Sequence, residues 1–443
     1  MPEAFADLAE LMREDQETAS ERREHELSER RHRRRRGLIV TASVFGVLLL
    51  LTGGYTGWAL TAPLPEPVEI SAAPLAPTGA AAALAAVRGS SALSISGADD
   101  YLGPAASGVF SASGSADAQS IASIAKLITA LVILDAKPLA SADDPGPTIT
   151  FGKAAHDLYD KYYVMGATVA RMPTGTTMSQ RDALATMLIP SACNYAEATS
   201  TWAFGSQRAF LEATRRWLDA HGLSGTTIVE PTGIDPRNTS TPADLIAIGK
   251  LAAANATIAK IASTRSLEVP VIGTITNTNS VLGMGGITGL KTGNLGQGAF
   301  NLLYTASFTV APGKQLDVTG IVLGGLSRDS VGLSVVALLD SIRAGFHDVA
   351  LAEAGQQVGT YSTPWGASAR LVLADAPSIF TWSDTPIEVS MTTTAPETYE
   401  DGAIVGEVTW TAGPHTASAP VEIDGTIEPP DEWWRLTHPG DLG

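Results

Sequence analysis

The chain has 443 residues, of which 44% are hydrophobic, and this is enough for two or three domains with apolar cores. The formal net charge of −17 argues against nucleic acid as a partner, because phosphate binding needs a basic surface. Cys193 is the single cysteine, so no intrachain disulfide can form, and the seven histidines show no metal-ligand spacing.

The first 60 residues predict a membrane anchor. Residues 1–36 mix acidic and arginine residues and are expected to form a cytoplasmic tail, either as a solvated helix or without fixed structure. Residues 37–60 carry no charge, and this run of 24 residues is long enough to cross a bilayer, which needs about 20. The arginine-rich cluster at residues 30–36 favours the cytoplasmic side, so the chain after residue 60 is expected outside the cell membrane. A cleaved signal peptide is the alternative, although 36 residues precede the run.

The rest of the chain divides by composition into three parts. Residues 61–85 are rich in Pro and Ala and predict an extended, semi-rigid linker. Residues 86–345 contain helical and then strand-like patterns, and residues 346–443 contain short alternating runs typical of a small β-rich domain. The helices expected in the middle part are 122–135, 179–203 with an interruption near Pro190, 210–221, 243–254 and 330–343, and the strands are 287–290, 299–310 and 316–323.

Ser123 and Lys126 lie three residues apart at the start of the first of these helices, so they share one face. A serine hydroxyl is a poor nucleophile unless a neighbouring base takes its proton. A lysine can act as that base if burial or a second cation favours its neutral form. The motif alone also fits a helix cap followed by a solvated lysine.

Lys291, Thr292 and Gly293 form a second polar motif, between two strand-like runs. A lysine and a hydroxyl at a strand edge can hold a carboxylate, and a glycine lets the backbone approach a substrate closely. Alone, this motif also fits a polar edge strand with a solvated lysine.

Together the two motifs resemble one family. Ser-x-x-Lys followed by Lys-Thr-Gly is typical of the penicillin-binding proteins and serine β-lactamases. The surrounding residues are similar to the low-mass D-alanyl-D-alanine carboxypeptidases, and the segments that carry this likeness are 121–126, 230–235, 240–244, 276–279 and 289–293. The resemblance covers about residues 85–345. It implies an α/β transpeptidase fold of the α+β type, in which helices flank an antiparallel sheet.

The third motif of that family, Ser-x-Asn, is altered in this chain. It falls at Ser191-Ala192-Cys193, so Cys193 stands where asparagine is expected, and Asn194 comes one residue late. A thiol is a weak donor and acceptor, so it would orient a substrate amide and the lysine poorly. A second departure is Asn294, which follows Gly293 where many relatives carry a threonine.

The resemblance implies acyl transfer on the D-Ala-D-Ala ends of peptidoglycan stem peptides, without a metal or organic cofactor. Ser123 would attack the carbonyl, Lys126 would take the serine proton, and Ser191 would relay a proton to the leaving D-alanine. The backbone N–H groups of Ser123 and Asn294 would form the oxyanion hole, and β-lactams would act as inhibitors that trap Ser123. The residues expected to contact the substrate are Cys193, Asn194, Lys291, Thr292, Gly293 and Asn294.

Other functions stay open. Cys193 would suit a catalytically impaired protein that binds peptidoglycan, and a β-lactamase or esterase could use the same fold. Carboxypeptidase and endopeptidase action need the same groups. The β-rich part could be a spacer, a protein-binding module or a membrane-surface contact. The adjacent Trp433 and Trp434 fit the last of these, but they fit partial burial in a domain as well.

Overall fold

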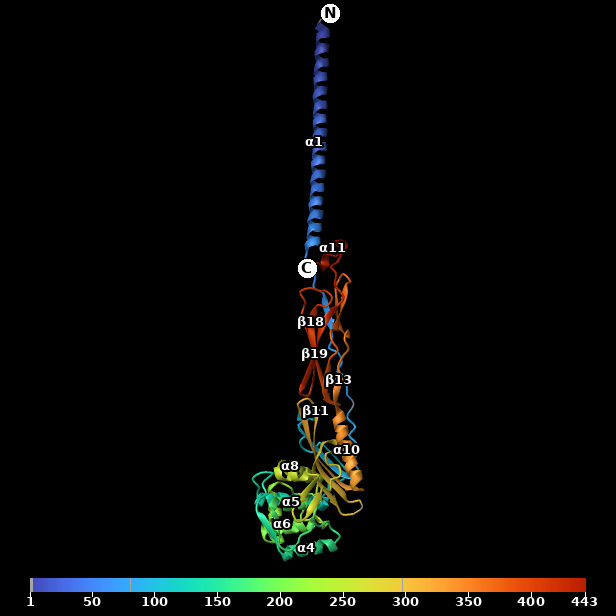
Figure 1. The fold of residues 1–443 in the computed structure, drawn as a ribbon. Helices are drawn as coiled ribbons and strands as arrows, with labels where there is room; N and C mark the ends of the chain where they lie inside the picture. The colour runs from blue at the N-terminus through green and yellow to red at the C-terminus, as the bar shows by residue number, and fades with distance from the viewer. Residues whose placement is uncertain (1–2, 80, 297) are drawn as a thin grey trace.

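The computed structural model describes residues 3–79, 81–296 and 298–443, so two residues of the expected tail, one of the expected linker and one of the segment 86–345 lie outside the described residues. The molecule is elongated (Figure 1). A long helix leads to a β domain, and a mixed domain of helices and strands lies at the far end from that helix. The chain runs from the long helix past the β domain to the mixed domain and then returns. Its last strands complete the sheet of the β domain, which also contains the first strand.

Helix α1 runs from Glu3 to Thr61 without a break. Its segment Arg31–Thr61 is long and apolar enough to cross a membrane, and its large apolar side chains from Leu38 to Leu51 are exposed. Exposure of so many apolar side chains is unfavourable in water and suits a lipid environment.

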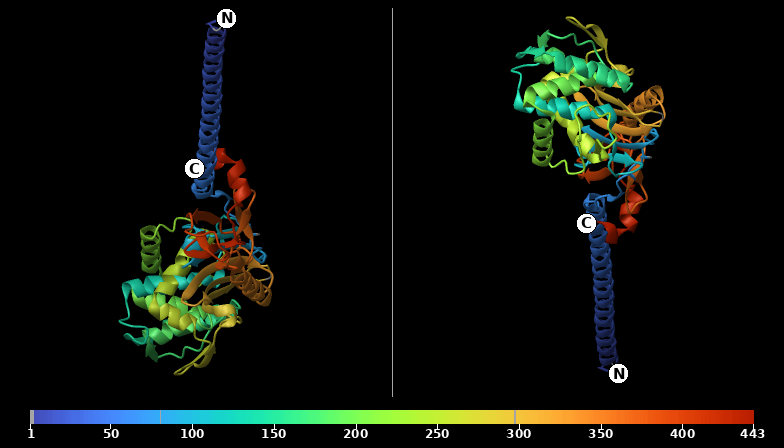
Figure 2. Two further views of the ribbon diagram at one scale, coloured as in Figure 1. Left: turned by 90° about the horizontal axis from the view of Figure 1, so that it is seen from above. Right: turned by 90° about the horizontal axis from the view of Figure 1, so that it is seen from below.

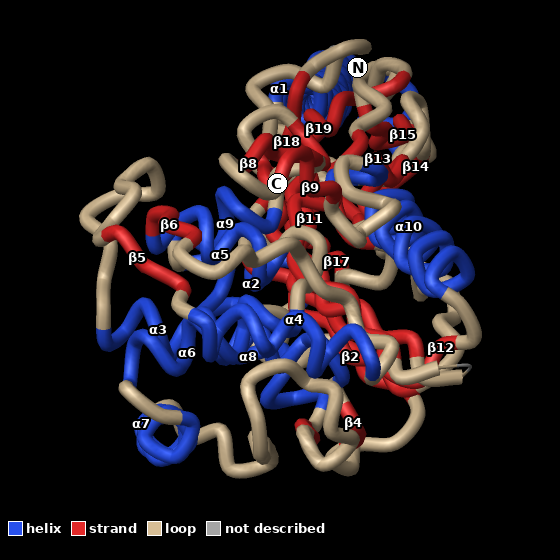
Figure 3. The backbone as a smooth tube through the Cα atoms, turned by 60° about the horizontal axis from the view of Figure 1, so that its bottom comes forward, coloured by secondary structure: helices blue, strands red, loops and turns tan. Residues whose placement is uncertain are grey.

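The mixed domain is built on a five-stranded antiparallel sheet in the order β10-β11-β12-β2-β3. The strands are β2 Ser90–Ser96, β3 Ser111–Ser113, β10 Ile287–Asn294, β11 Phe300–Ala311 and β12 Lys314–Gly325. Side chains alternate between its two faces: Leu303 packs against the helical side, whereas Leu302 and Tyr304 pack against α10, Arg328–Gly345. Helices cover both faces, which explains why β11 is buried over most of its length (Figure 3).

The mixed domain also contains the remaining helices, most of them on the helical side of the sheet, and three short strand pairs. The helices are α2 Asp99–Leu102, α3 Ala125–Ala136, α4 Lys153–Val164, α5 Gln180–Leu188, α6 Cys193–Phe204, α7 Gln207–Ala220, α8 Pro242–Ala254 and α9 Ala256–Ala262, with 3₁₀ turns at Ala122–Ile124 and Met284–Gly286. The short strands are β4 Gln119–Ser120, β5 Thr148–Phe151, β6 Thr176–Ser179, β7 Thr239–Ser240, β8 Ser266–Val269 and β9 Gly273–Thr276.

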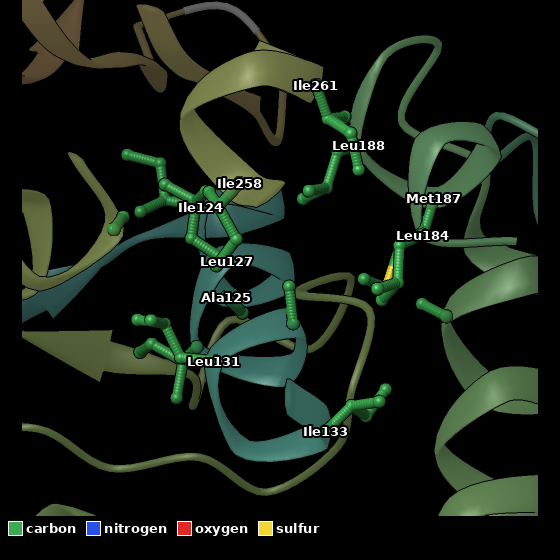
Figure 4. Packing of buried hydrophobic residues seen from close by; sticks show 14 of the residues in the cluster. Ile124, Ala125, Leu127, Leu131, Ile133, Leu184, Met187, Leu188, Ile258 and Ile261 are labelled. Atoms are coloured by element: carbon green, nitrogen blue, oxygen red, sulfur yellow. The ribbon is translucent and has the colours of Figure 1, made fainter. Parts of the chain in front are cut away.

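Helix α3 lies at the centre of this side. Its residues from Ala125 to Leu134 are all buried, because neighbouring helices and the sheet surround it. Figure 4 shows Ile124 and Leu127 near Ile258 of α9, with Leu184 and Leu188 of α5 beyond them. The core therefore fixes the turn that precedes α3, which carries Ser123.

The β domain contains a six-stranded sheet in the order β1-β14-β15-β19-β18-β17 and a separate β13–β16 pair. The strands are β1 Val68–Ser71, β13 Phe346–Ala350, β14 Gln357–Ser362, β15 Ser368–Leu373, β16 Ser378–Trp382, β17 Ile387–Thr393, β18 Ile404–Ala412 and β19 His415–Asp424. Its core contains the fully buried Trp410. Helix α11, Glu432–Thr437, and a 3₁₀ turn at Pro439–Asp441 follow the sheet.

The segment 179–203 forms two helices, α5 and α6, so the expected interruption near Pro190 is confirmed. Another expectation differs from the structure in detail. The expected linker 61–85 contains β1, which pairs with β14 at the edge of the sheet, and the Ala85 N–H donates to Ser341 Oγ at 2.9 Å. The described part of this segment is therefore attached to both domains.

Candidate active site

The proposed nucleophile, Ser123, lies in the 3₁₀ turn that leads into α3. The preceding residue, Ala122, has a φ of 51°, a conformation that costs an alanine about 1–3 kcal/mol. Gly233 and Gly293 make this turn possible. A Cβ on Gly293 would lie 2.7 Å from the Ile121 carbonyl oxygen, and one on Gly233 would lie 1.9 Å from the Ala122 carbonyl oxygen. Two glycine segments from distant parts of the chain thus hold the serine turn by close backbone contact.

Lys126 is fully buried, and its Nζ has three partners. It donates to Ser123 Oγ at 3.0 Å, to Cys193 Sγ at 3.4 Å and to the Thr232 carbonyl at 2.6 Å. None of these partners is a carboxylate, so no anion among the described residues pairs with the amine. The position directly beside Ser123 Oγ is the geometry that a general base requires.

The Glu230 carboxylate fixes the loop that carries the Thr232 carbonyl. Glu230 accepts hydrogen bonds from the backbone N–H groups of Thr232 at 2.7 Å and Gly233 at 2.6 Å, and a third from Asp235 at 3.3 Å. Its Oε1 also accepts from Asn238 Nδ2. This loop therefore places one partner of the catalytic-site lysine through its backbone.

Ser191 lies between α5 and α6 and is buried, with a φ of 71°. Such backbone strain in a residue other than glycine is common at functional sites. Cys193 begins α6, and its N–H donates to the Thr168 carbonyl at 2.8 Å. Asn194 is turned away from Lys126: its side chain donates to the Ala170 carbonyl at 2.8 Å and accepts from the Ala170 N–H at 3.1 Å.

The Lys291-Thr292-Gly293 motif lies on β10, beside the serine turn. Burial, together with the nearby charge of Lys126, holds the pKa of Lys291 well below its usual range. Its Nζ donates to the Thr292 carbonyl at 3.2 Å. Thr292 Oγ1 lies 2.7 Å from Thr278 Oγ1, so two hydroxyls face the same space.

These groups border one cleft of about 380 Å³. The predicted residues that line it are Ser123, Ser191, Cys193, Thr292, Gly293 and Asn294. Lys126 and Lys291 lie behind this surface, and Asn194 is outside its lining. The structure thus brings the three motifs together, but two of the predicted substrate contacts, Lys291 and Asn194, do not line the cleft.

Sequence reasoning missed two groups in the cleft, Arg328 and Thr278. Arg328 is the first residue of α10 and places a guanidinium near Lys291. The sequence hardly indicates that Arg328 lines the cleft, because an arginine that follows a strand is common on protein surfaces. Thr278 belongs to the segment 276–279 that resembles the family, but its hydroxyl becomes relevant only through the contact with Thr292.

A second hollow of about 440 Å³ shares Met165 and Ile234 with the cleft. It is lined partly by apolar groups and partly by Lys161 and Glu197, which form an ion pair of 2.6 Å. It holds none of the three motifs, so we place the chemistry in the smaller cleft. Within the described residues, no group of three His, Cys, Asp or Glu side chains is arranged to hold a metal ion.

Comparison with known proteins agrees with the resemblance. A family model described as D-alanyl-D-alanine carboxypeptidase, peptidase family S11, matches residues 103–325. Two curated D-alanyl-D-alanine endopeptidases, from Pseudomonas aeruginosa and Escherichia coli, are 35% and 32% identical over 126 residues. These matches cover 28% of this chain and 37% of each relative, so the chain spans little more than a third of their length.

Solved structures share the fold. Penicillin-binding protein 5 from Haemophilus influenzae has a TM-score of 0.51 at 19% identity, covering 78% of this chain and 98% of its own. The D-alanyl-D-alanine carboxypeptidase DacD from Francisella tularensis has a TM-score of 0.52 at 15% identity, covering 81% and 98%. Penicillin-binding protein 6B from Escherichia coli has a TM-score of 0.51 at 20% identity, covering 80% and 99%. The expected transpeptidase fold is confirmed.

Proposed function

The chain belongs to the D-alanyl-D-alanine carboxypeptidase family, and from this we propose that it cleaves the D-Ala-D-Ala ends of peptidoglycan stem peptides through an acyl-enzyme on Ser123. The observation that carries the proposal is the buried Lys126 Nζ, which lies 3.0 Å from the Oγ of Ser123, a residue that lines an open cleft. A lysine amine without a carboxylate partner can accept the serine proton as the hydroxyl attacks.

Ser191 supplies the next proton transfer in this proposal. The residue borders the cleft on the side of α6, close to Cys193, which contacts Lys126. A hydroxyl there can pass its proton to the leaving amine of D-alanine and regain one from Lys126, which holds the proton taken from Ser123. Water then attacks the acyl group and releases Ser123.

The developing oxyanion would be held by the backbone N–H groups of Ser123 and Asn294. Both residues line the cleft and come from its two sides, the serine turn and the end of β10. Backbone donors of this kind stabilise charge in the transition state without rearranging.

The terminal carboxylate of the peptide would bind at the other end of the cleft. Thr292 and Thr278 offer hydroxyl donors, and Arg328 offers a guanidinium, which suits a carboxylate because it can donate two parallel hydrogen bonds. Lys291 lies behind Thr292 and adds positive potential to this end when it is protonated.

The position of the Cys193 thiol supports an active enzyme over a catalytically impaired protein. Its Sγ lies 3.4 Å from Lys126 Nζ, so the altered third motif still gives the lysine a polar partner. Asn194 does not take over this position, because its side chain is engaged with the Ala170 backbone.

Helix α1 is proposed to anchor the protein in the cell membrane as a single span. Its uncharged run follows the arginine-rich cluster 30–36, which favours the cytoplasmic side, so both domains would lie outside. This is the compartment in which peptidoglycan is found.

Fluorescent penicillin tests the nucleophile directly. The detergent-solubilised full chain is expected to bind the label covalently, and Ser123→Ala is expected to abolish labelling while the protein stays folded by circular dichroism. Release of D-alanine from a pentapeptide is the second assay. A folded wild-type protein that neither labels nor releases D-alanine would contradict the proposal and favour the peptidoglycan-binding role. Rapid turnover of the penicillin would favour a β-lactamase.

Endopeptidase action is a second candidate, because both curated relatives carry that name. The second hollow beside the cleft leaves room for a larger peptide on one side of Ser123. Digestion of cross-linked and uncross-linked muropeptides, separated by chromatography, distinguishes the two activities: an endopeptidase converts dimers to monomers, and a carboxypeptidase shortens pentapeptides.

A further inference from the structure

Helix α11 packs against the outer end of α1, as both views of Figure 2 show. Tyr55 Oη donates to the Leu436 carbonyl at 2.6 Å. Arg435 Nη1 donates to the Ala62 carbonyl at 2.8 Å and to the Ala59 carbonyl at 3.4 Å. Ala59 is fully buried and Ala62 is almost fully buried at this contact.

The sequence of α1 explains why α11 fits there. Residues 55, 59 and 62 lie on one face, at spacings of four and three, and the two alanines allow a close approach. The last carbonyls of a helix have no partner within it, and they carry the negative end of the helix dipole. The Arg435 guanidinium satisfies two of the carbonyls near this end and complements the dipole.

A second attachment holds the segment that follows α1. Strand β1 pairs with β14 along its whole length, and Tyr361 Oη donates to Glu69 Oε2 at 3.2 Å. The Gly443 N–H donates to the Pro63 carbonyl at 3.2 Å. The C-terminal part of the chain is therefore joined to α1 through α11, and the β domain is joined to the segment after α1 through β14.

The length of the apolar run places this joint at a membrane surface. Residues 37–60 form 24 residues of helix, or about 36 Å at about 1.5 Å per residue. The hydrocarbon core of a bilayer is about 30 Å thick, so about four residues at the outer end extend into the interface. The contact of α11 with residues 55–62 coincides with that level.

The side chains around the joint are those that favour a bilayer interface. Trp433 is 73% exposed, Trp58 is 47% exposed, and Tyr55 is 39% exposed and lies 6.1 Å from the Trp58 ring. Amphipathic aromatic rings concentrate at the headgroup level of membranes. By contrast Trp434, next to Trp433, packs against Trp365, so the exposed tryptophan is not required for the domain core.

We propose that α11, docked on the outer end of α1, forms a membrane-interface collar in which Trp433 inserts beside Tyr55 and Trp58 into the headgroup region of the bilayer. The proposal rests on the proposed membrane anchor. The partner is a phospholipid surface, because the collar is continuous with the membrane-spanning segment. The collar would fix the direction in which the β domain, and the mixed domain beyond it, leave the membrane (Figure 1).

Brominated phospholipids test this placement. The full chain is reconstituted into bilayers with bromine near the headgroup, and tryptophan quenching is compared between the wild type, Trp433→Phe and Trp410→Phe. Trp410 is the matched control, because it is fully buried in the β domain. The amount of tryptophan emission that bromine quenches is expected to fall in Trp433→Phe and to stay unchanged in Trp410→Phe. The quenching that remains in Trp433→Phe is expected to come from Trp58. Equal quenching in all three proteins overturns the proposal.

A second pair of variants tests whether docking on α1 places Trp433. Arg435→Ala removes the donor to the α1 carbonyls and is expected to reduce the quenching, whereas Arg370→Ala, an exposed arginine in the same domain, is expected to leave it unchanged. Quenching that Arg435→Ala leaves unchanged contradicts the collar. Extraction of the wild type by alkaline carbonate would instead show that the anchor itself is wrong, which separates the two proposals. If Trp433 instead binds a protein, it would contribute nothing to the lipid quenching while α1 is inserted, and this result too overturns the collar.

Discussion

The Nζ of Lys126 lies 3.4 Å from the Sγ of Cys193, at the position where the family carries an asparagine. In the part of the chain that the structure describes, the Lys126 amine has two other hydrogen-bond partners, Ser123 Oγ and the Thr232 carbonyl. The thiol is therefore part of the small set of groups that positions the amine, and its loss leaves a buried polar group with fewer partners.

Substitution of Cys193 should affect acylation in a graded way. Cys193→Ala removes a partner of a buried amine, a change worth about 1–3 kcal/mol, so we expect acylation by a penicillin to slow by about 10- to 100-fold. Cys193→Asn supplies a stronger donor and acceptor and is expected to match or exceed the wild type. Second-order acylation rates measure both effects. A Cys193→Ala rate equal to the wild type would show that the thiol does not position Lys126.

Gly293→Ala should separate β10 from the serine turn. The new Cβ would lie 2.7 Å from the Ile121 carbonyl oxygen and 3.0 Å from the Ala122 Cβ, and overpacking of this kind costs about 1–3 kcal/mol. We expect acylation of Ser123 to fall by at least 10-fold. Gly152→Ala is the control, because a Cβ there meets nothing within 4 Å. Penicillin labelling rates, with melting temperatures measured in parallel, distinguish a displaced site from an unfolded protein.

The pH dependence of stability should report on Lys291. Burial holds its pKa well below the usual value of about 10.5, so the folded protein releases this proton at lower pH than the unfolded chain does. Between the two pKa values the unfolded state binds more protons, and the free energy of unfolding therefore rises with pH.

Lys291→Met removes this contribution. In thermal unfolding between pH 7 and pH 10, the melting temperature of the wild type is expected to rise relative to that of Lys291→Met. Parallel curves for the two proteins would show that the pKa of Lys291 does not change on folding.

The sequence predicts the parts of this site that depend on local spacing. Ser123 and Lys126 fall on one helical face, and the apolar run after them forms the buried helix α3. The resemblance to the family adds the placement of Lys291 and Thr292 at the same cleft. These two kinds of reasoning identify part of the cleft lining, namely Ser123, Ser191, Cys193, Thr292, Gly293 and Asn294.

Features that depend on contacts between distant segments were not predictable. Helix α4 has one buried residue, Tyr162, so its apolar pattern is weak, and β1 is ordered by its pairing with β14. The approach of Gly293 to the serine turn, like the position of Arg328, follows from how β10 and α10 pack. No periodicity within a short window contains that information.

Arg328 gives the test that is most specific for substrate class. Its guanidinium lines the cleft near Lys291, and a charged hydrogen bond to a carboxylate is worth about 1.5–3 kcal/mol. Arg328→Ala is therefore expected to lower kcat/KM for a peptide ending in free D-Ala-D-Ala by about 10- to 100-fold. The same peptide with an amidated end lacks the carboxylate and should be affected much less. Arg208→Ala, on the exposed side of α7, is the control. An equal loss for both peptides would mean that Arg328 shapes the cleft without binding the carboxylate, because a structural defect does not depend on the charge of the substrate.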